Sequence, residues 1–209
     1  PIFGGIPVKE SVVVTWIIMA VIVGLCIIFV RSLSVENPGK VQLLLESAIG
    51  KGLDFFEDIM GKENRKYIPY LITVLIYIGI ANIIGLFGFK SPTKDLNVTA
   101  ALAVMSIVLV QYAGIHKKGF KGWLKSFTQP MAIVTPINIL ELFIKPLSLC
   151  MRLFGNVLGA FVIMELLKSL IPVVLPVPFS FYFDIFDGLI QAYVFVFLTS
   201  LYIKEAVEE

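Results

Sequence analysis

The sequence predicts an all-α, polytopic membrane protein. Of its 209 residues, 58% are hydrophobic and only 15% are charged, and the mean hydropathy of +0.92 lies above the range of ordinary soluble domains. Residues 11–30, 67–89 and 96–115 carry no charge. Each of these segments reaches the roughly 20 residues that a helix needs to cross the hydrocarbon layer of a membrane. We therefore expect one membrane domain that covers residues 1–209.

The first half of the chain is expected to contain three spans and one interfacial helix. We place the three spans at 11–30, 66–89 and 96–116. Between the first two, segment 38–62 has apolar residues at helical spacing with charged residues between them, a pattern typical of a helix that lies in the membrane interface. The basic segment 116–130 is expected to be a loop. Asp95 is well placed to cap the third span with its carboxylate.

The second half of the chain combines apolar runs with charged residues. Segment 131–171 is interrupted by Glu141, Lys145, Arg152 and Glu165, and segment 179–205 contains Asp184, Asp187 and Gln191. The three prolines within 171–180 favour a turn between the two segments. We expect two long, tilted membrane helices that form a C-terminal hairpin.

Lysine and arginine residues near the ends of the spans divide unevenly between the two sides of the membrane. Most of them follow the first or the third span, and only Lys9, Lys90 and Lys94 fall on the other side. Positive charge is typical of cytoplasmic loops. The pattern therefore predicts an external N-terminus and a cytoplasmic C-terminus.

Polar and small residues share one face of the expected helix around Arg152. At 100° per residue, five residues lie within about 60° of it: Lys145, Ser148, Gly155, Asn156 and Gly159. An arginine at bilayer depth costs between about 3 and more than 10 kcal/mol, so it normally faces water or a partner and marks an ion path.

The last helix is expected to have a polar face of its own. Asp184, Asp187 and Gln191 are three, four and seven residues apart, a spacing that places them on one side of an α-helix. One alternative is a static salt bridge between Arg152 and Asp184, Asp187 or Glu165. It would leave two acids spare for carrying ions.

The sequence lacks the motifs of several classes of enzyme and binding site, which excludes those classes. The sequence has no phosphate-binding glycine loop, zincin histidine pair, nucleophile elbow or dinucleotide fingerprint. We therefore expect no cofactor or metal, no nucleic acid, and nucleotide chemistry only on other chains.

The main alternative function is a self-contained secondary transporter or channel, but such folds usually show internal repeats and none is visible. A purely structural anchor would leave the aligned polar residues without a role.

Two segments of the C-terminal half resemble subunit a of F-type ATP synthases: PINILELFIKPLSLCMRLFGNVLGA and LIQAYVFVFLTSLYI. The stretch SPTKDLNVT also fits that family. The resemblance implies a non-catalytic membrane stator that faces a rotating c-ring, with two offset half-channels that carry H⁺ or Na⁺ to and from the ring carboxylates. It also implies peripheral-stalk b subunits and membrane lipid as partners, and a bacterial plasma (inner) membrane as the location, with a chloroplast membrane as the alternative.

The resemblance assigns roles to four polar residues near the middle of the expected hairpin. Arg152 corresponds to the essential stator charge, and Gln191 to its neighbour on the final helix. Asn156 and Ser148 are polar companions along the same groove. The choice between H⁺ and Na⁺ stays open, because the coordinating carboxylate belongs to the ring.

The resemblance leaves the acid of the external half-channel undecided. Asp184 corresponds to a position where relatives carry a histidine or an acid. Phe161, however, stands where some relatives place a glutamate, so Asp187 and Glu165 remain alternatives. Candidates for the cytoplasmic half-channel are Glu141, Lys145 and Asn138.

Overall fold

The computed structural model describes residues 9–31, 39–87, 91–127, 133, 135–170 and 176–208. These residues are almost entirely helical, and no strand occurs among them. Five of the described helical segments are long and apolar enough to cross a membrane: Glu10–Val30, Lys62–Ile83, Leu96–Ser126, Thr135–Ser169 and Pro178–Glu208. The predicted all-α, polytopic fold is confirmed.

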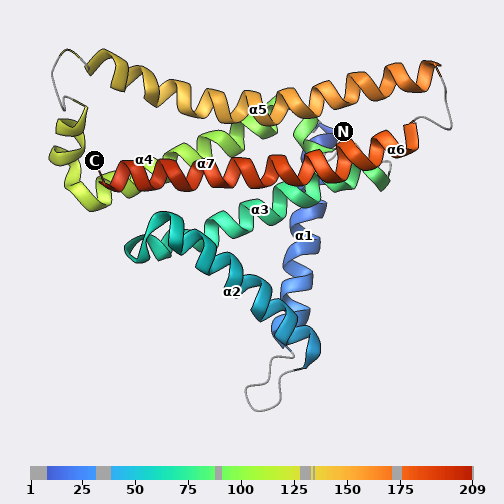
Figure 1. The fold of residues 1–209 in the computed structure, drawn as a ribbon, viewed down its shortest axis with the longest axis horizontal. Helices are drawn as coiled ribbons and strands as arrows, with labels where there is room; N and C mark the ends of the chain where they lie inside the picture. The colour runs from blue at the N-terminus through green and yellow to red at the C-terminus, as the bar shows by residue number, and fades with distance from the viewer. Residues whose placement is uncertain are drawn as a thin grey trace, which may run out of the picture.

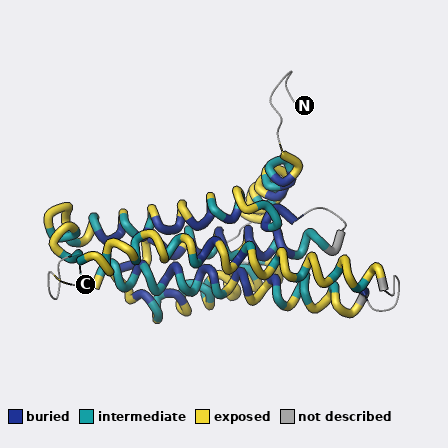
Figure 2. The backbone as a smooth tube through the Cα atoms, turned by 90° about the horizontal axis from the view of Figure 1, so that it is seen from above, coloured by how far each residue is buried: buried dark blue, intermediate teal, exposed yellow. Residues whose placement is uncertain are grey.

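Four long helices run alongside one another, and α1 (Glu10–Arg31) runs across them (Figure 1). The four are α3 (Ile68–Ile83), α4 (Leu96–Ser126), α5 (Thr135–Leu170) and α7 (Gly188–Glu208). Helix α7 packs against α3 and α4, and α4 also packs against α5. Buried residues gather where these helices meet, whereas α1 is largely exposed (Figure 2). The core is therefore formed by α3, α4 and α7, with α5 on its outside.

Helix α2 (Lys40–Met60) occupies most of the segment expected to form the amphipathic helix. Its C-terminal end is docked: Phe56 and Met60 are buried, and the Phe55 ring lies 6.0 Å from the Tyr193 ring of α7. A short 3₁₀ segment, η1 (Lys62–Tyr67), then leads into α3. The start of α2 leaves its apolar side chains exposed, as expected of a helix that meets lipid.

The last part of the chain contains a π-helix that the sequence pattern did not predict. After the short helix α6 (Pro176–Ser180) comes η5 (Phe181–Asp187), a π-helical segment that continues directly into α7. π-Helical turns are rare and are often found at functional sites. Both Asp184 and Asp187 belong to this segment.

The expectation of a loop at 116–130 is wrong for the described part of that segment. Helix α4 continues to Ser126, with a break at Gly119, whose φ of 72° lies in the left-handed region that favours glycine. Beyond the break, Trp123 Nε1 donates a hydrogen bond to Gln111 Oε1 at 2.8 Å and so fastens the final turns to the body of α4. The high density of lysine in this segment concealed the helix.

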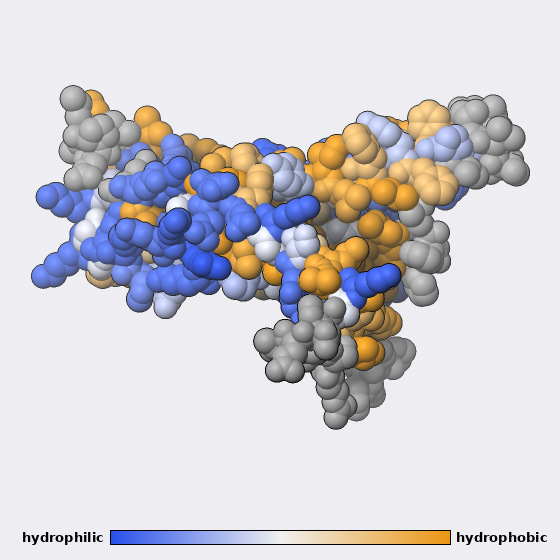
Figure 3. Space-filling model, turned by 60° about the horizontal axis from the view of Figure 1, so that its bottom comes forward, coloured by the Kyte–Doolittle hydropathy of each residue, from blue (hydrophilic) through white to orange (hydrophobic). Residues whose placement is uncertain are grey.

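Some of the expected segments extend into residues that the structure does not describe. These are residues 32–38, 88–90, 128–132, 134, 171–175 and both ends of the chain. The expected turn between the two C-terminal helices is among them. Figure 3 shows that the hydrophilic surface gathers at the end of the molecule where α4 and α7 end.

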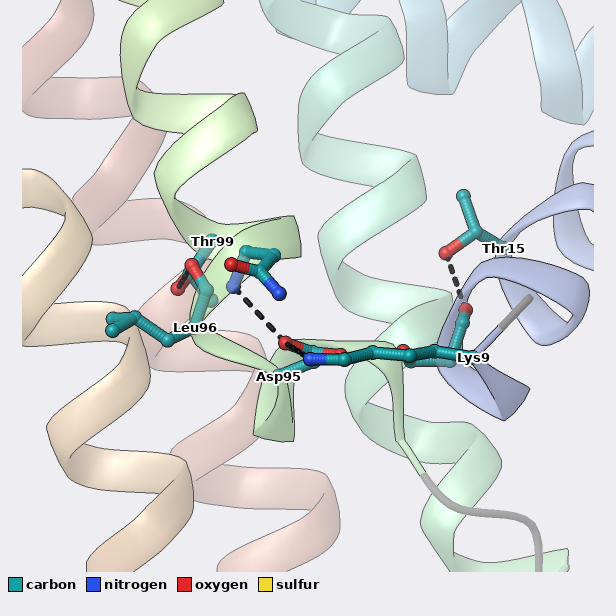
Figure 4. A network of polar contacts seen from close by, with 7 residues as sticks. Lys9, Thr15, Asp95, Leu96 and Thr99 are labelled. Atoms are coloured by element: carbon teal, nitrogen blue, oxygen red, sulfur yellow. Dashed lines mark hydrogen bonds and ion pairs between the residues drawn. The ribbon is translucent and has the colours of Figure 1, made fainter. Parts of the chain in front are cut away.

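Asp95 joins the start of α1 to the start of α4 (Figure 4). Its Oδ1 accepts a hydrogen bond from the Asn97 backbone N–H at 3.1 Å, which confirms the predicted helix cap. Its Oδ2 accepts from the Ser11 hydroxyl at 2.7 Å and lies 3.3 Å from Lys9 Nζ. The Ser11 hydroxyl first, and then Asn97 and Lys9, hold the pKa of the Asp95 carboxyl below its ordinary value although burial opposes them.

We expect Asp95→Ala to lower the stability of the folded chain by about 1 kcal/mol, the usual cost of losing a helix cap. Because the folded-state pKa of Asp95 is lowered, its contribution is complete above the ordinary carboxyl pKa of about 4 and is lost as the pH falls through the lowered value. Thermal unfolding of the protein in detergent at neutral and at strongly acidic pH measures this. Asn97→Ala, which keeps the backbone donor, is the control, and an equal loss at both pH values would contradict the assignment.

Candidate functional site

Arg152 lies near the middle of α5 on a face that no described part of the chain covers. Arg152 and Asn156 are exposed, and a Cβ atom added at Gly155 or Gly159 would meet nothing within 4 Å. The side of the helix next to this face is buried through Leu149, Cys150 and Leu153. The predicted polar face is therefore open from Arg152 to Gly159, whereas Lys145 and Ser148 on the same face are half-buried.

The Arg152 guanidinium forms no hydrogen bond or ion pair with any residue that the structure describes. Of the acids considered as static partners, Glu165 lies 3.3 Å from Lys168 Nζ, and Asp187 Oδ1 accepts a hydrogen bond from Gln191 Nε2 at 3.5 Å. The structure gives no support to a static salt bridge. The cation is available to a group outside this chain.

Gln191 does not share the open face of Arg152. It is buried, with 8% of its surface exposed, between α7 and its neighbours. The only hydrogen bond of its side chain among the described residues goes to Asp187, one turn earlier. Gln191 thus links the interior of the helix bundle to the π-helical segment.

A first cavity of about 300 Å³ lies between the C-terminal half of α5 and the segment η5. Asp184 and Asp187 lie on its wall, and so do Lys94 and Lys168. Asp184 lies close against Gly85, where an added Cβ would come within 3.2 Å of Asp184 Oδ1. Of the three acids proposed for the external path, two therefore reach the cavity. Glu165 is absent from its wall and pairs with Lys168 instead.

Lys94 places a positive charge at the edge of this cavity. Its ammonium lies 4.8 Å from the centre of the Phe161 ring, a cation–π contact. Burial lowers the pKa of Lys94, and the negative charge of Asp184 opposes that effect. The position where some relatives are expected to carry a glutamate therefore holds an aromatic ring covered by a lysine.

A buried polar network fixes the wall of the first cavity. Asn82 Nδ2 donates a hydrogen bond to the Gly188 carbonyl at 2.9 Å, and Asn82 Oδ1 accepts one from Thr93 Oγ1 at 2.7 Å. Ser91 Oγ donates to the Ala81 carbonyl at 2.6 Å. Because Gly188 directly follows η5, the network holds the π-helical segment to α3 and to the turn before α4.

A second cavity of about 390 Å³ lies at the other end of the hairpin, between α4, the N-terminal half of α5 and the end of α7. Asn138, Glu141, Lys145 and Glu205 are on its wall. Lys145 Nζ lies 2.8 Å from Glu205 Oε1 and 3.2 Å from Glu141 Oε2. The predicted set of Glu141, Lys145 and Asn138 is thus brought together here, with Glu205 added.

The two cavities share no wall residue, and Arg152 lies between them along α5. Lys145, on the second cavity, precedes Arg152 by seven residues, and Val157, on the first, follows it by five. At about 1.5 Å per residue these separations are about 10 Å and about 8 Å. Ser148, Asn156 and Gln191 belong to neither wall and also lie in the zone between the cavities.

Several polar residues on these walls were not singled out from the sequence, among them Asn82, Lys94, Lys168 and Glu205. Asn82 is an amide inside an apolar span, which is a usable signal. The other three lie near helix ends, where charged residues are common and carry no signal. Among the described residues, no group of three histidine, cysteine, aspartate or glutamate side chains is arranged to bind a metal.

Comparison with known proteins shows similarity to one family, the one already suggested by the sequence motifs, along nearly the whole chain. The family model described as ATP synthase A chain matches residues 12–204. ATP synthase subunit a of Moorella thermoacetica is 40% identical over 98% of this chain and 93% of its own length, and ATP synthase subunit a 2 of a Bradyrhizobium species is 35% identical over 98% and 91%. The protein of Propionigenium modestum named ATP synthase subunit a, sodium ion specific, is 34% identical over 97% of this chain and 75% of its own length.

Proposed function

This chain belongs to the ATP synthase A chain family, and on that premise we propose that it is the stator that couples ion flow to rotation of a c-ring. As a member of the family it is a multi-pass membrane protein and the ion-translocating subunit of a larger complex. The c-ring and the peripheral-stalk b subunits are its proposed partners. Nucleotide chemistry is proposed to take place on other subunits.

The observation that carries the proposal is the position of Arg152. This residue lies between two separate cavities and has no partner among the described residues. A membrane-embedded arginine needs compensation for the loss of water. A carboxylate on a neighbouring, moving subunit would provide it, and the open face of α5 gives that subunit access.

Electrostatics explains how Arg152 keeps the two cavities separate. A unit charge about 4 Å away at an effective dielectric constant of 20 interacts by about 4 kcal/mol. This is enough to hold a passing ring carboxylate in its ionised form and so to release its proton or sodium ion. The same energy is comparable with the ~2.3 kcal/mol per charge that 100 mV provides, so the contact must also break easily. The guanidinium group keeps its proton in proteins and therefore does not relay ions itself.

The cavities provide the two half-channels in this scheme. The first, with Asp184 and Asp187, leads ions from the external side to the ring, and the second, with Glu141, Lys145 and Asn138, leads them to the cytoplasm. Asn156, Ser148 and Gln191 line the route near Arg152. Glu165 has a lesser role, because its contact with Lys168 keeps it off the cavity wall. The transported ion is H⁺ or Na⁺, and no cofactor is needed.

The distribution of charge supports an external N-terminus and a cytoplasmic C-terminus in a bacterial plasma membrane. The end of the molecule where the second cavity lies is also the end where the lysines of α4 gather: Lys117, Lys118, Lys121 and Lys125. Lys204 of α7 lies at the same end. Cytoplasmic flanks of membrane helices carry such an excess of positive charge.

We expect Asp184→Asn to slow ion entry from the external side severalfold without preventing assembly of the complex. The amide keeps the size of the side chain but cannot exchange a proton or neutralise a cation in the cavity. The rate of ATP synthesis in reconstituted vesicles, as a function of external ion concentration, measures the effect. Glu165→Gln is the matched control and should be nearly silent. If Glu165→Gln slowed ion entry more than Asp184→Asn, the role would pass to Glu165. If Asp187→Asn slowed ion entry severalfold while Asp184→Asn did not, the role would pass to Asp187.

The decisive test of the function itself is the removal of the Arg152 charge in the assembled complex. Ion-coupled ATP synthesis should then be lost while the complex still assembles.

A further inference from the structure

We propose that Glu205 is a further ion-path residue, whose carboxylate sets the charge of the second cavity through its contact with Lys145. The inference rests on the proposed function, because it assigns to Glu205 a part in the cytoplasmic half-channel. Neither the motifs around Arg152 nor those around Gln191 include this position, which lies near the end of α7.

The geometry places Lys145 between two acids from different helices. Glu205 of α7 lies 2.8 Å and Glu141 of α5 lies 3.2 Å from its ammonium, and the ring of Tyr202 lies 5.4 Å away. All four side chains belong to the wall of the second cavity. The contact with Glu205 is the shorter and crosses from one arm of the hairpin to the other.

The contact between Glu205 and Lys145 changes the charge that a cation encounters between Arg152 and the second cavity. Lys145 lies only about 10 Å from Arg152 along the helix, so without compensation both charges would repel a cation in this part of the path. Glu141 alone would cancel Lys145. With Glu205 as well, the three side chains carry one net negative charge, which offsets the positive charge of Lys118 on the same wall, so the cavity does not repel protons or sodium ions.

The other charged groups on the cavity wall do not replace Glu205. Helix α4 contributes Lys118, which is positive, and the neutral polar residues Gln111, Trp123 and Ser126. Helix α5 contributes Glu141 and Lys145, and α7 contributes Tyr202 and Glu205. With Lys118 counted, the cavity wall is balanced, and the loss of either glutamate makes it positive.

A charge series in the whole complex separates this role from a structural one. Glu205→Gln makes the cavity more positive by one charge, and the double variant Glu141→Gln/Glu205→Gln by two. The triple variant, with Lys145→Gln added, returns the cavity to the charge of the single variant while removing every ion pair. ATP-driven cation uptake by inverted membrane vesicles, whose cytoplasmic face is outward, is measured for each.

The uptake rate should follow the charge of the cavity. Each added positive charge is expected to slow uptake by between about twofold and about fifteenfold, the range for unit charges about 10 Å apart at effective dielectric constants of 80 and 20. The triple variant should recover to the rate of the single variant. Where protons are the transported ion, Glu205→Gln should also shift the half-maximal cytoplasmic pH downward, because a more positive cavity concentrates protons less.

Glu208→Gln is the matched control, since Glu208 also lies near the end of α7, 3.9 Å from Lys204, but is not on the cavity wall. It should behave as the wild type. A triple variant as slow as or slower than the double variant would show that Glu205 only fastens the two helices and would overturn the inference. Where protons are the transported ion, an unshifted pH profile would overturn it as well. Arg152→Ala in the same vesicles separates the two failures: if it pumps normally, the proposed function is wrong, and if it is inactive while Glu205→Gln matches the wild type, only this inference is wrong.

Discussion

Arg152→Ala is expected to abolish ion-coupled ATP synthesis in assembled complexes. Without the guanidinium, no charge separates the two cavities, and a ring carboxylate can pass between them with its ion still bound. Ions then cross the membrane without driving full turns of the rotor, or the rotor turns without taking up and releasing ions at the two cavities. The measurement is ATP synthesis driven by an imposed ion gradient in reconstituted vesicles, together with the passive ion leak in the absence of nucleotide.

Two further variants make the Arg152 result interpretable. Arg152→Lys keeps a positive charge but not the forked donors or the permanent protonation of arginine, so we expect weak synthesis and an increased leak. Arg65→Ala removes an exposed arginine that lies 3.7 Å from Glu57 and should leave synthesis unchanged. Synthesis at the wild-type rate in Arg152→Ala complexes would disprove the stator assignment.

Gly188→Val should prevent the chain from folding into a functional complex, and Gly188→Ala should destabilise it strongly. A Cβ atom at this position would lie 2.8 Å from the Cβ of Asn82, and a contact between two Cβ atoms cannot be relieved by rotating a side chain. Helices α3 and α7 would have to separate, which breaks the hydrogen bond from Asn82 to the Gly188 carbonyl. Overpacking of this kind costs about 1–3 kcal/mol even for a single added methyl group.

The effect of Gly188→Ala is measured as the amount of complex that survives purification and as its thermal stability in detergent. Gly79→Ala is a control in the same interface, because its added Cβ would lie 3.7 Å from Leu189 Cδ2, an ordinary van der Waals contact. We expect this variant to assemble normally. Equal losses for both glycines would mean that the close approach of Asn82 to Gly188 is not what limits packing.

The fold was largely predictable because apolar length and helical spacing decide it. The charge-free runs near the N-terminus and the two long C-terminal segments appear as the expected helices. The helical extension after Gly119 was missed because it is lysine-rich, and the hydrogen bond between Trp123 and Gln111 that ties it to the rest of α4 spans a break in the helix. A pattern within one segment does not report such a contact.

The candidate site was only partly predictable, for a geometrical reason. The open face around Arg152 follows from helical spacing within one regular helix. The alignment of Asp184 with Gln191, by contrast, assumes an α-helix throughout, and the π-helical segment turns the chain by less per residue, so the acids reach the cavity while Gln191 is buried. The contact between Lys145 and Glu205 depends on the register of two antiparallel helices, which no single segment encodes.

The bare backbone at Gly155 and Gly159 has a mechanical consequence. Ordinary protein interfaces gain affinity by interlocking side chains, and such a contact would have to be unpacked each time a ring subunit moved past. Under the proposed function, a smooth strip beside one charge would keep successive rotor positions nearly equal in energy, so that little of the ion gradient would be lost as friction. On this surface, weak adhesion is an advantage.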